Sequence, residues 1–241
     1  YGTIIGHADV RRMLATMKAD IFTARAIALD CAIAIDMARA TGEAEWEARA
    51  AFLTPIAKAF GTDVGCEVSS TGVQVHGGMG FVEETGAAQY YRDVRVTAIY
   101  EGTNGIQAMD MVGRKLMDGG EAAGRLLDEI EADAEAAKAA LPELAEAVWQ
   151  AAETLRETTE WLVAQPMAER FGTAVPYLRA FARVLGGHYH LRAALADKDG
   201  PHGRLAQFYI TRILPEHAGL LAHVRAGEAA LMALSPDDLA A

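Results

Sequence analysis

Cysteines are scarce in this sequence, and long apolar runs are missing. Only two cysteines occur among 241 residues, Cys31 and Cys66, with no CxxC spacing. This favours buried free thiols in a reducing compartment over a disulfide framework or a thiolate metal site. No apolar run approaches the ~20 residues that cross a bilayer. The sequence also starts without Met and without a basic region followed by an apolar core. We therefore expect no signal peptide, and either a processed chain or a piece of a longer one.

An excess of basic residues is also missing. The sequence holds 22 Lys and Arg against 33 Asp and Glu, giving a net charge of -11. This balance argues against nucleic acid or an anionic membrane surface as the main partner. Aromatic residues are few at 7%, yet the apolar fraction of 51% is large enough to exclude a disordered chain. Much of that fraction is alanine, which favours helices over strands.

The first third of the sequence is helical in pattern. Apolar residues recur at helical spacing from residue 9 to about residue 40, which predicts an amphipathic helix with Asp9 as N-cap and Gly42 at the turn that ends it. A second helical stretch follows, and Thr54-Pro55 is expected to begin a fresh helix as N-cap and first residue. The side chains expected to face the core are Phe52, Ile56, Phe60 and Val64.

Glycines divide the rest of the sequence. The stretch STGVQVHGGMGFVEETG interrupts the helical pattern, a short helix is expected over residues 83–93, and helical periodicity returns after Gly105. The segment MDGGEAAG at 117–124 is the best candidate for a domain boundary. Beyond it we expect a helical hairpin over 121–165 that turns near Leu141-Pro142, then helices over 175–196 and 205–225. The fold class is therefore all-α, with one helical domain at 1–117 and a second at 118–241.

Two short segments carry candidate chemistry. In QVHGGMGF, residues 74–81, the glycines allow the backbone to approach a ligand, although helix turns also use glycine routinely. In IYEGTNGIQ, residues 99–107, Glu101 is the single acid. It is either a helix N-terminal acid stabilised by the helix dipole or a general base, which desolvation by a substrate would strengthen. In the second reading Gly102 leaves room for the substrate, while Thr103 and the amides of Asn104 and Gly105 bind a polar cofactor.

Together these segments resemble the carboxy-terminal helical domain of the acyl-CoA dehydrogenases. That family has a Gln-x-x-Gly-Gly-x-Gly stretch, then Arg-Asp, then an Ile-Tyr-Glu-Gly-Thr-x-x-Ile-Gln block. The matching elements here are Gln74 with Gly77, Gly78 and Gly80, then Arg92-Asp93, then residues 99–107. They match without a gap over about thirty-four residues, and a looser likeness covers about the first 117. The resemblance implies that residues 1–117 form the family's antiparallel helical bundle, incomplete at its N-terminal end.

The resemblance also implies roles for these residues. Glu101 takes the position of the base that removes the α-proton of an acyl-CoA thioester while the β-hydrogen leaves as hydride to N5 of FAD. Its own backbone N–H, with a flavin hydroxyl, would polarise the thioester carbonyl. Tyr100 and Gly102 take substrate-contacting positions. The FAD-contacting positions are Gln74, Val75, His76, Gly77 and Gly78, which reach a neighbouring subunit's cofactor, and Thr103, Asn104 and Gly105.

Other polar residues are assigned structural roles. Arg92 and Asp93 are expected to form a structural ion pair. We predict no metal site, because His188 and His190 stand far from any acidic cluster in sequence and point to different helix faces.

The sequence departs from the family pattern at both ends. The family's amino-terminal helical domain and middle β-domain are not seen here, so we expect this chain by itself to be inactive. Ordinary members stop near position 117, whereas this sequence continues. The continuation resembles the extended bacterial branch that includes 3-methylmercaptopropionyl-CoA dehydrogenases. Its aromatic residues are expected to serve packing on the core or on a neighbouring subunit: Trp149, Trp161, Phe171, Tyr177 and Phe181.

Partners and rival functions follow from the same resemblance. It implies an acyl-CoA substrate, electron-transferring flavoprotein as electron acceptor, and a homo-oligomer, dimer or tetramer, in the bacterial cytoplasm. An acyl-CoA oxidase would use the same base and flavin. A non-catalytic helical assembly module is a third reading. The family's DNA-associated branch is disfavoured, because acidic residues outnumber basic ones in both halves of the sequence.

Overall fold

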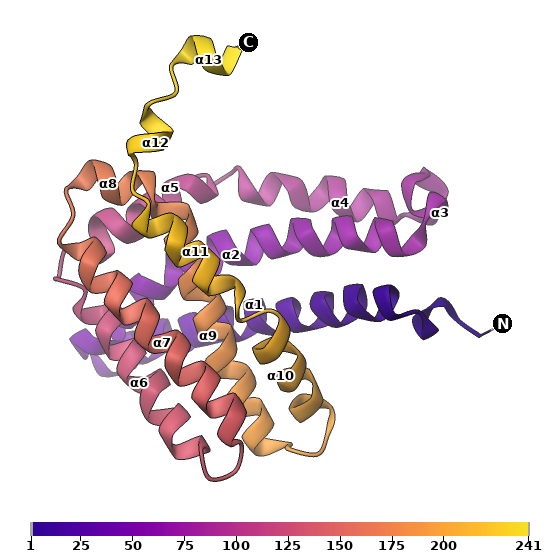
Figure 1. The fold of residues 1–241 in the computed structure, drawn as a ribbon, viewed down its shortest axis with the longest axis horizontal. Helices are drawn as coiled ribbons and strands as arrows, with labels where there is room; N and C mark the ends of the chain where they lie inside the picture. Colours follow the sequence, from indigo (N-terminus) through magenta and orange to yellow (C-terminus); the bar gives the residue numbers. More distant parts are fainter. Residues whose placement is uncertain (1, 241) are drawn as a thin grey trace.

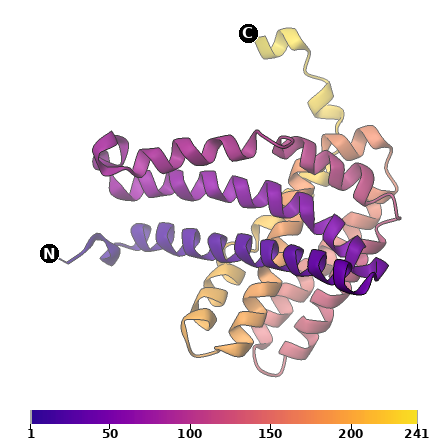
Figure 2. The same ribbon diagram turned by 180° about the vertical axis from the view of Figure 1, so that it is seen from behind.

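The computed structural model describes residues 2–240, and every regular element in that range is helical. The predicted all-α class is therefore confirmed. Two groups of helices make up the molecule (Figure 1). In the first, α1 (Ala8–Thr41), α2 (Ala44–His76) and α4 (Ala87–Arg95) run side by side. In the second, α6 (Glu121–Ala137), α7 (Pro142–Val163), α9 (Ala174–Ala196) and α10 (Pro201–Arg212) pack across one end of the first group, as the reverse view also shows (Figure 2).

Helix α1 begins one residue earlier than its pattern predicts. The N-cap is His7, so the expectation that Asp9 caps the helix is wrong. Asp9 lies instead in the first turn, where its carboxylate interacts favourably with the helix dipole and pairs with Arg12 at 2.8 Å. The other end is confirmed: Gly42 adopts φ +70° and donates its N–H to the carbonyl of Ala38.

Helix α2 continues through Pro55, so the expected new start at Thr54-Pro55 is wrong. Proline removes one helical hydrogen bond, but Pro55 and the predicted core residues of this helix are all buried. Burial of that apolar face outweighs the lost bond. The helix also extends to His76, so the predicted interruption begins only at Gly77, where φ is +63°.

After Gly77 the chain reverses and returns along α2. It forms α3 (Gly78–Phe81), a 3-10 turn (Glu83–Thr85) and then α4, whose Val94 meets Gly65 of α2 at close range. Arg92 of α4 pairs with Glu83 at 2.7 Å, so the expected Arg92–Asp93 pair is wrong. Adjacent helical residues do not face each other. A 3-10 turn (Val96–Ala98), α5 (Asn104–Asp110) and a π-helical turn (Met111–Lys115) complete this part.

The later helices follow the predicted order with one difference. The α6–α7 hairpin turns at Leu141, as expected. The helix predicted over 205–225 is two helices, because Pro215 interrupts it: α10 ends at Arg212 and α11 (Glu216–Arg225) follows. The shorter helices are α8 (Met167–Gly172), α12 (Ala229–Met232) and α13 (Pro236–Ala240), and the last two project away from the body (Figure 1).

Helix α9 joins the two groups. It packs against α1, α2 and α5 on one side and against α6, α7, α10 and α11 on the other. Its Tyr177 and Phe181 are fully buried, whereas Phe171 of α8 keeps 40% of its surface exposed; Trp149 and Trp161 pack partly buried against the core. The second half of the chain thus packs on the first, and one hydrophobic core runs through both.

Ion pairs also connect the two halves. Arg49 on α2 bonds Glu129 on α6 at 2.6 Å, and Arg183 on α9 bonds Asp20 on α1 at 2.5 Å. Arg183 and Asp20 are almost completely buried, so each depends on the other for its charge to be tolerated.

The two thiols are free, Cys31 buried and Cys66 partly buried. Among residues 2–240, no helix is both long and apolar enough to cross a membrane.

Candidate active site

The loop between the Val96–Ala98 turn and α5 has a strained backbone. Glu101 has φ +54°, and it is the one non-glycine residue with positive φ among residues 2–240. Gly102 follows at φ +82°, and a Cβ there would lie 3.2 Å from Nε2 of Gln107. Left-handed conformations cost an L-residue roughly 1–2 kcal/mol, and such strain gathers at functional sites. The loop therefore holds Glu101 in a conformation that its sequence alone does not prefer.

Asn104 fixes this loop to α2. Its amide nitrogen donates to Asp63 Oδ1 at 2.6 Å and to Thr62 Oγ1 at 2.9 Å. Its Oδ1 accepts from Lys58 Nζ at 2.8 Å, and the same ammonium donates to the carbonyl of Gly102 at 2.8 Å. Burial raises the pKa of Asp63, against the hydrogen bond from Asn104, which lowers it. The Asn104 side chain is thus occupied inside the protein and is not directed at a ligand.

The residues just before Asn104 are open to solvent. Tyr100, Glu101, Gly102 and Thr103 are all exposed. Thr103 is the N-cap of α5, accepting from the N–H of Ile106, and Gln107 donates to the carbonyl of Glu101 at 3.1 Å. Anchored backbone and free side chains together present the Glu101 carboxylate outward from a fixed position.

The second predicted segment lies elsewhere on the molecule. Gln74, Val75 and His76 form the last turn of α2, followed by Gly77 and Gly78. At a rise of about 1.5 Å per residue, Gln74 is roughly 24 Å along the helix from Lys58. The structure therefore does not bring the two candidate segments together within one chain. Around residues 76–78 the surface is open: the His76 side chain is exposed, and a Cβ on either glycine would meet no atom within 4 Å.

A band of exposed apolar side chains runs between these segments. It lies on α3, α4, the Val96–Ala98 turn and α5, and includes Phe81 at 80% exposure and Tyr90 at 75%. The other members are Met79, Tyr91, Val96, Ile99, Tyr100 and Ile106. Large exposed apolar side chains in this number favour a contact with another part of the protein or a partner.

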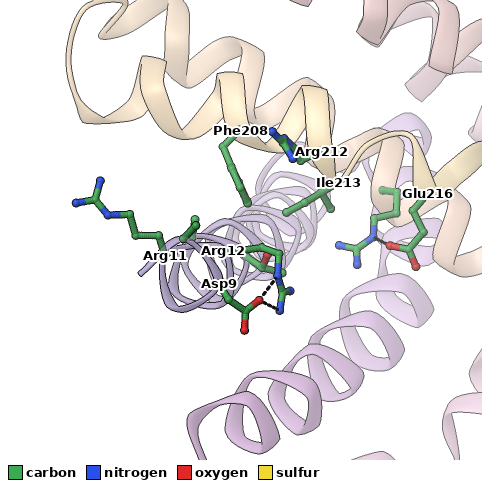
Figure 3. A pocket seen from close by; sticks show the side chains of 11 residues that line it. Asp9, Arg11, Arg12, Phe208, Arg212, Ile213 and Glu216 are labelled. Atoms are coloured by element: carbon green, nitrogen blue, oxygen red, sulfur yellow. Dashed lines mark hydrogen bonds and ion pairs between the residues drawn. The ribbon is translucent and has the colours of Figure 1, made fainter. Parts of the chain in front are cut away.

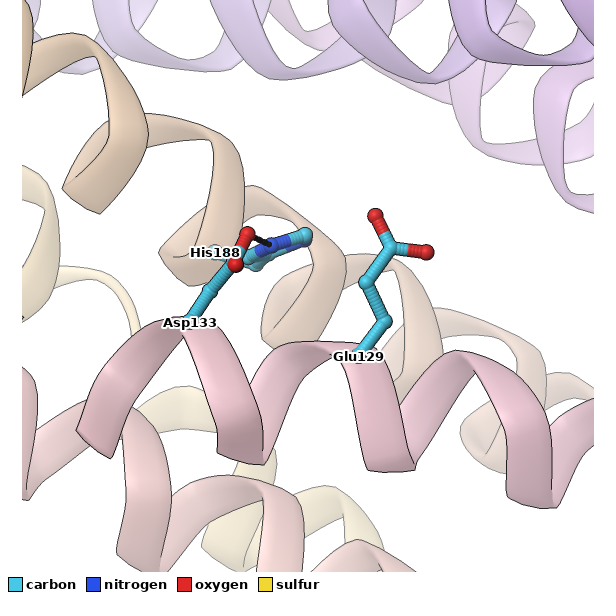
Figure 4. A group of neighbouring side chains, drawn as sticks. All are labelled: Glu129, Asp133 and His188. Atoms are coloured by element: carbon cyan, nitrogen blue, oxygen red, sulfur yellow. Dashed lines mark hydrogen bonds and ion pairs between the residues drawn. The ribbon is translucent and has the colours of Figure 1, made fainter. Parts of the chain in front are cut away.

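A separate polar cluster was not predicted from the sequence. His188 on α9 lies 2.8 Å from Asp133 on α6, and Glu129 stands one turn away (Figure 4). The ligand-type atoms of these three residues lie within 4.8 Å of one another. Arg49 and Arg192 already pair with the carboxylates, at 2.6 Å for Glu129 and 3.7 Å for Asp133. Burial lowers the pKa of His188. These contacts describe a structural network between two helices.

The sequence had placed His188 far from any acidic cluster, and in space this is wrong. Its partner is 55 residues away in the chain. No local sequence pattern predicts such a pair. The expectation that His188 and His190 point to different helix faces is confirmed. His190 faces α1, where its Nε2 lies 3.3 Å from the carbonyl of Ala19.

Two family models match this chain. Residues 1–117 match "Acyl-CoA dehydrogenase, C-terminal domain", and residues 126–235 match "Acetyl-CoA dehydrogenase C-terminal like". The chain belongs to the acyl-CoA dehydrogenase family. The gap between the two matches falls where glycines predict a domain boundary, and the division itself stays a prediction.

Individual relatives agree with this assignment. The 3-methylmercaptopropionyl-CoA dehydrogenase of Ruegeria pomeroyi is 39% identical over 221 residues, which cover 87% of this chain and 38% of that protein. A butyryl-CoA dehydrogenase of Syntrophomonas wolfei is 32% identical over 244 residues, covering 90% and 39%. The chain thus spans less than two-fifths of the length of these relatives.

A solved structure has the same fold. The crystal structure of Caenorhabditis elegans ACDH-11 in complex with C11-CoA superposes with a TM-score of 0.73 at 20% identity, over 83% of this chain and 35% of that one. At this identity the likeness concerns the fold alone.

Proposed function

We propose that this chain is the C-terminal part of an FAD-dependent acyl-CoA dehydrogenase that removes hydrogen from the α and β carbons of an acyl-CoA thioester. The observation that carries the proposal is Glu101, an exposed carboxylate held at positive φ on a loop anchored to α2. A base must meet its proton in a fixed direction, and strain maintained by the surroundings provides that direction.

Each residue of the loop then has a task. Glu101 accepts the α-proton, and its own N–H points to the thioester carbonyl, where negative charge develops. Tyr100 and Gly102 line the acyl group. Gly102 has no side chain to occupy the space of the substrate, and a Cβ at this position would also crowd Gln107. When substrate covers the exposed carboxylate, water leaves, which makes a carboxylate a stronger base.

The family uses FAD, and the residues here fit it in part. The open turn at Gly77 and Gly78, with Gln74 and His76 beside it, suits a polar cofactor that belongs to a neighbouring subunit. Thr103 and Gly105 remain as contacts beside Glu101, whereas Asn104 supports the loop through its side chain. When bound, FAD supplies the acceptor for the β-hydride.

The remaining expectations follow from this reading. The other walls of the acyl and flavin site come from parts of the protein outside this chain, so the chain alone is inactive. The full-length protein is a cytoplasmic bacterial homo-oligomer that passes electrons to electron-transferring flavoprotein.

The test is an anaerobic titration of the full-length protein with acyl-CoA thioesters of increasing chain length, followed by flavin absorbance. We expect bleaching in the parent and a rate at least about a hundredfold lower in Glu101→Gln, because a positioned base contributes 10²–10⁴-fold. Glu84→Gln, an exposed acid outside the loop, is the matched control and should bleach like the parent.

Equal bleaching in parent and Glu101→Gln would refute the base assignment. Bound flavin that no acyl-CoA reduces would favour the assembly module. Rapid peroxide formation on exposure to oxygen, without electron-transferring flavoprotein, would identify an oxidase.

A further inference from the structure

A cleft of about 880 Å³ lies between the first turns of α1 and the α10–α11 corner (Figure 3). Its floor is apolar and includes Ala15 from α1 and Phe208 and Ile213 from α10 and the residue after it. Arg11 and Arg212 stand at its edges. The cleft is distinct from the Glu101 loop, since the first turns of α1 lie at the Gln74 end of α2, whereas that loop is fixed to Lys58.

The charge of this cleft opposes that of the chain. Arg183 at the inner end is neutralised by Asp20 and Glu216, and Arg12 by Asp9. Arg11 donates only to the carbonyl of Ile5. Within residues 2–240, neither Arg11 nor Arg212 has a carboxylate partner. A protein with a net charge of -11 thus exposes two unmatched guanidinium groups beside an apolar floor, which favours an acidic and partly apolar occupant.

The last described residues have the complementary character. We call residues 228–240, which contain α12 and α13, the C-terminal arm. Neither helix buries a residue. Leu231, Met232, Leu234 and Leu239 are 56%, 70%, 52% and 73% exposed, and Asp237 and Asp238 stand among them. Large apolar side chains gathered on a projecting segment indicate a binding partner.

The arm is directed away from the cleft of its own chain. Gly227 turns the backbone at φ +72°, and Glu169 on α8 accepts the N–H of Glu228 at 2.8 Å. This bond fixes the exit of the arm beside α8. In both views the arm leaves on the side opposite α10 and far from the start of α1 (Figures 1 and 2). The arm therefore does not fill the cleft of its own chain.

We propose that the C-terminal arm of one copy binds in the α1–α10 cleft of a second copy. The leucines and Met232 cover the apolar floor, in the manner of an amphipathic helix in a groove. Asp237 and Asp238 meet Arg11 and Arg212. In a two-fold dimer the contact forms twice, because each copy offers one arm and one cleft.

The test is disulfide trapping in the full-length protein with Cys66→Ser as background. One tagged copy carries Leu234→Cys in the arm, and a differently tagged copy carries Ala15→Cys in the cleft. After co-expression and mild oxidation we expect a disulfide between the two tags. Ala140→Cys, on the exposed turn before α7, replaces Ala15→Cys in the matched control. Equal yields from cleft and control positions would overturn the proposal.

Charge reversal sharpens this assay. Asp237→Lys with Asp238→Lys in the arm should reduce the cross-link yield about tenfold, the size expected for two exposed ion pairs. Adding Arg11→Glu and Arg212→Glu in the cleft copy should restore the yield. These positions are exposed, so folding is preserved. A loss that the second reversal does not restore would also overturn the proposal.

Discussion

Asn104 shows how a residue next to a candidate base can act through the backbone. Its side chain joins Lys58, Thr62 and Asp63 on α2, and Lys58 in turn holds the carbonyl of Gly102. The strain at Glu101 persists because these bonds over-determine the loop. The position of the carboxylate therefore depends on polar contacts that lie behind it.

Removal of this anchor should loosen the loop. In Asn104→Ala, Lys58 and Asp63 lose a shared partner, so the free energy of unfolding should fall by about 1–2 kcal/mol. The bleaching rate of the full-length flavoprotein should fall with it, because Glu101 is then less well positioned. Urea denaturation and the anaerobic titration measure the two effects. Gln89→Ala, on the exposed side of α4, is the control, and an anchor variant that behaves like it would contradict this account.

At the scale of helices, the effect of a residue depends on what faces it. Pro55 is tolerated inside α2 because it is buried with its neighbours. Pro215 separates α10 from α11. The same contrast applies to glycines in helices. A Cβ added to Gly186 of α9 would collide with the Tyr209 hydroxyl and lie 2.7 Å from Thr23 Cγ2, whereas a Cβ added to Gly124 of α6 would meet no atom within 4 Å.

Alanine should therefore have opposite effects at these two glycines. Gly186→Ala should destabilise the protein by about 1–3 kcal/mol through overpacking between α9, α10 and α1. Gly124→Ala should stabilise it by about 0.5–1 kcal/mol, because alanine loses less backbone entropy in a helix. Urea unfolding followed by circular dichroism compares them directly. If both substitutions changed the free energy of unfolding in the same direction, the close approach of α9 to Tyr209 would not be the cause of overpacking.

At the scale of the whole molecule, buried histidines couple stability to pH. Burial lowers the pKa of His190 to about 4, against the hydrogen bond to the Ala19 carbonyl, which raises it. Its ring stacks on Tyr209 at 4.3 Å between centroids. An unfolded histidine titrates near 6.5, so between pH 6.5 and 4 the unfolded state binds a proton that the folded state does not. Above pH 6.5 the burial of neutral His190 therefore does not lower the free energy of unfolding. As the pH drops from 6.5 to 4, the free energy of unfolding falls.

We expect His190→Phe, which keeps a ring on Tyr209, to flatten this dependence. The parent should lose up to about 3 kcal/mol from His190 between pH 6.5 and 4, and the variant should not. Unfolding by urea at pH 7.5, 6, 5 and 4.5 measures the difference. His188, which is also buried, remains in both proteins, so only the difference between parent and variant is diagnostic. His223→Gln, at an exposed position, is the control, and a parallel loss in parent and His190→Phe would refute the assignment.

The sequence predicts this fold well where the signals are local. Helical periodicity located α1, α6, α7 and α9, and Gly42 marked the end of α1. The helix ends that depend on tertiary packing, at Pro55 and His76, were placed wrongly. The candidate segment is recognisable because its residues are contiguous, from 99 to 107. Its catalytic function stays a proposal.

The sequence by itself determined the helical class, the family and the candidate base, since periodicity and a contiguous motif need no distant partner. Only the tertiary structure decided what supports that base and what joins the halves. Asn104 to α2, His188 to Asp133 and Arg183 to Asp20 connect residues 41 to 163 positions apart. Such contacts depend on how helices pack, and many packings are compatible with one helical pattern.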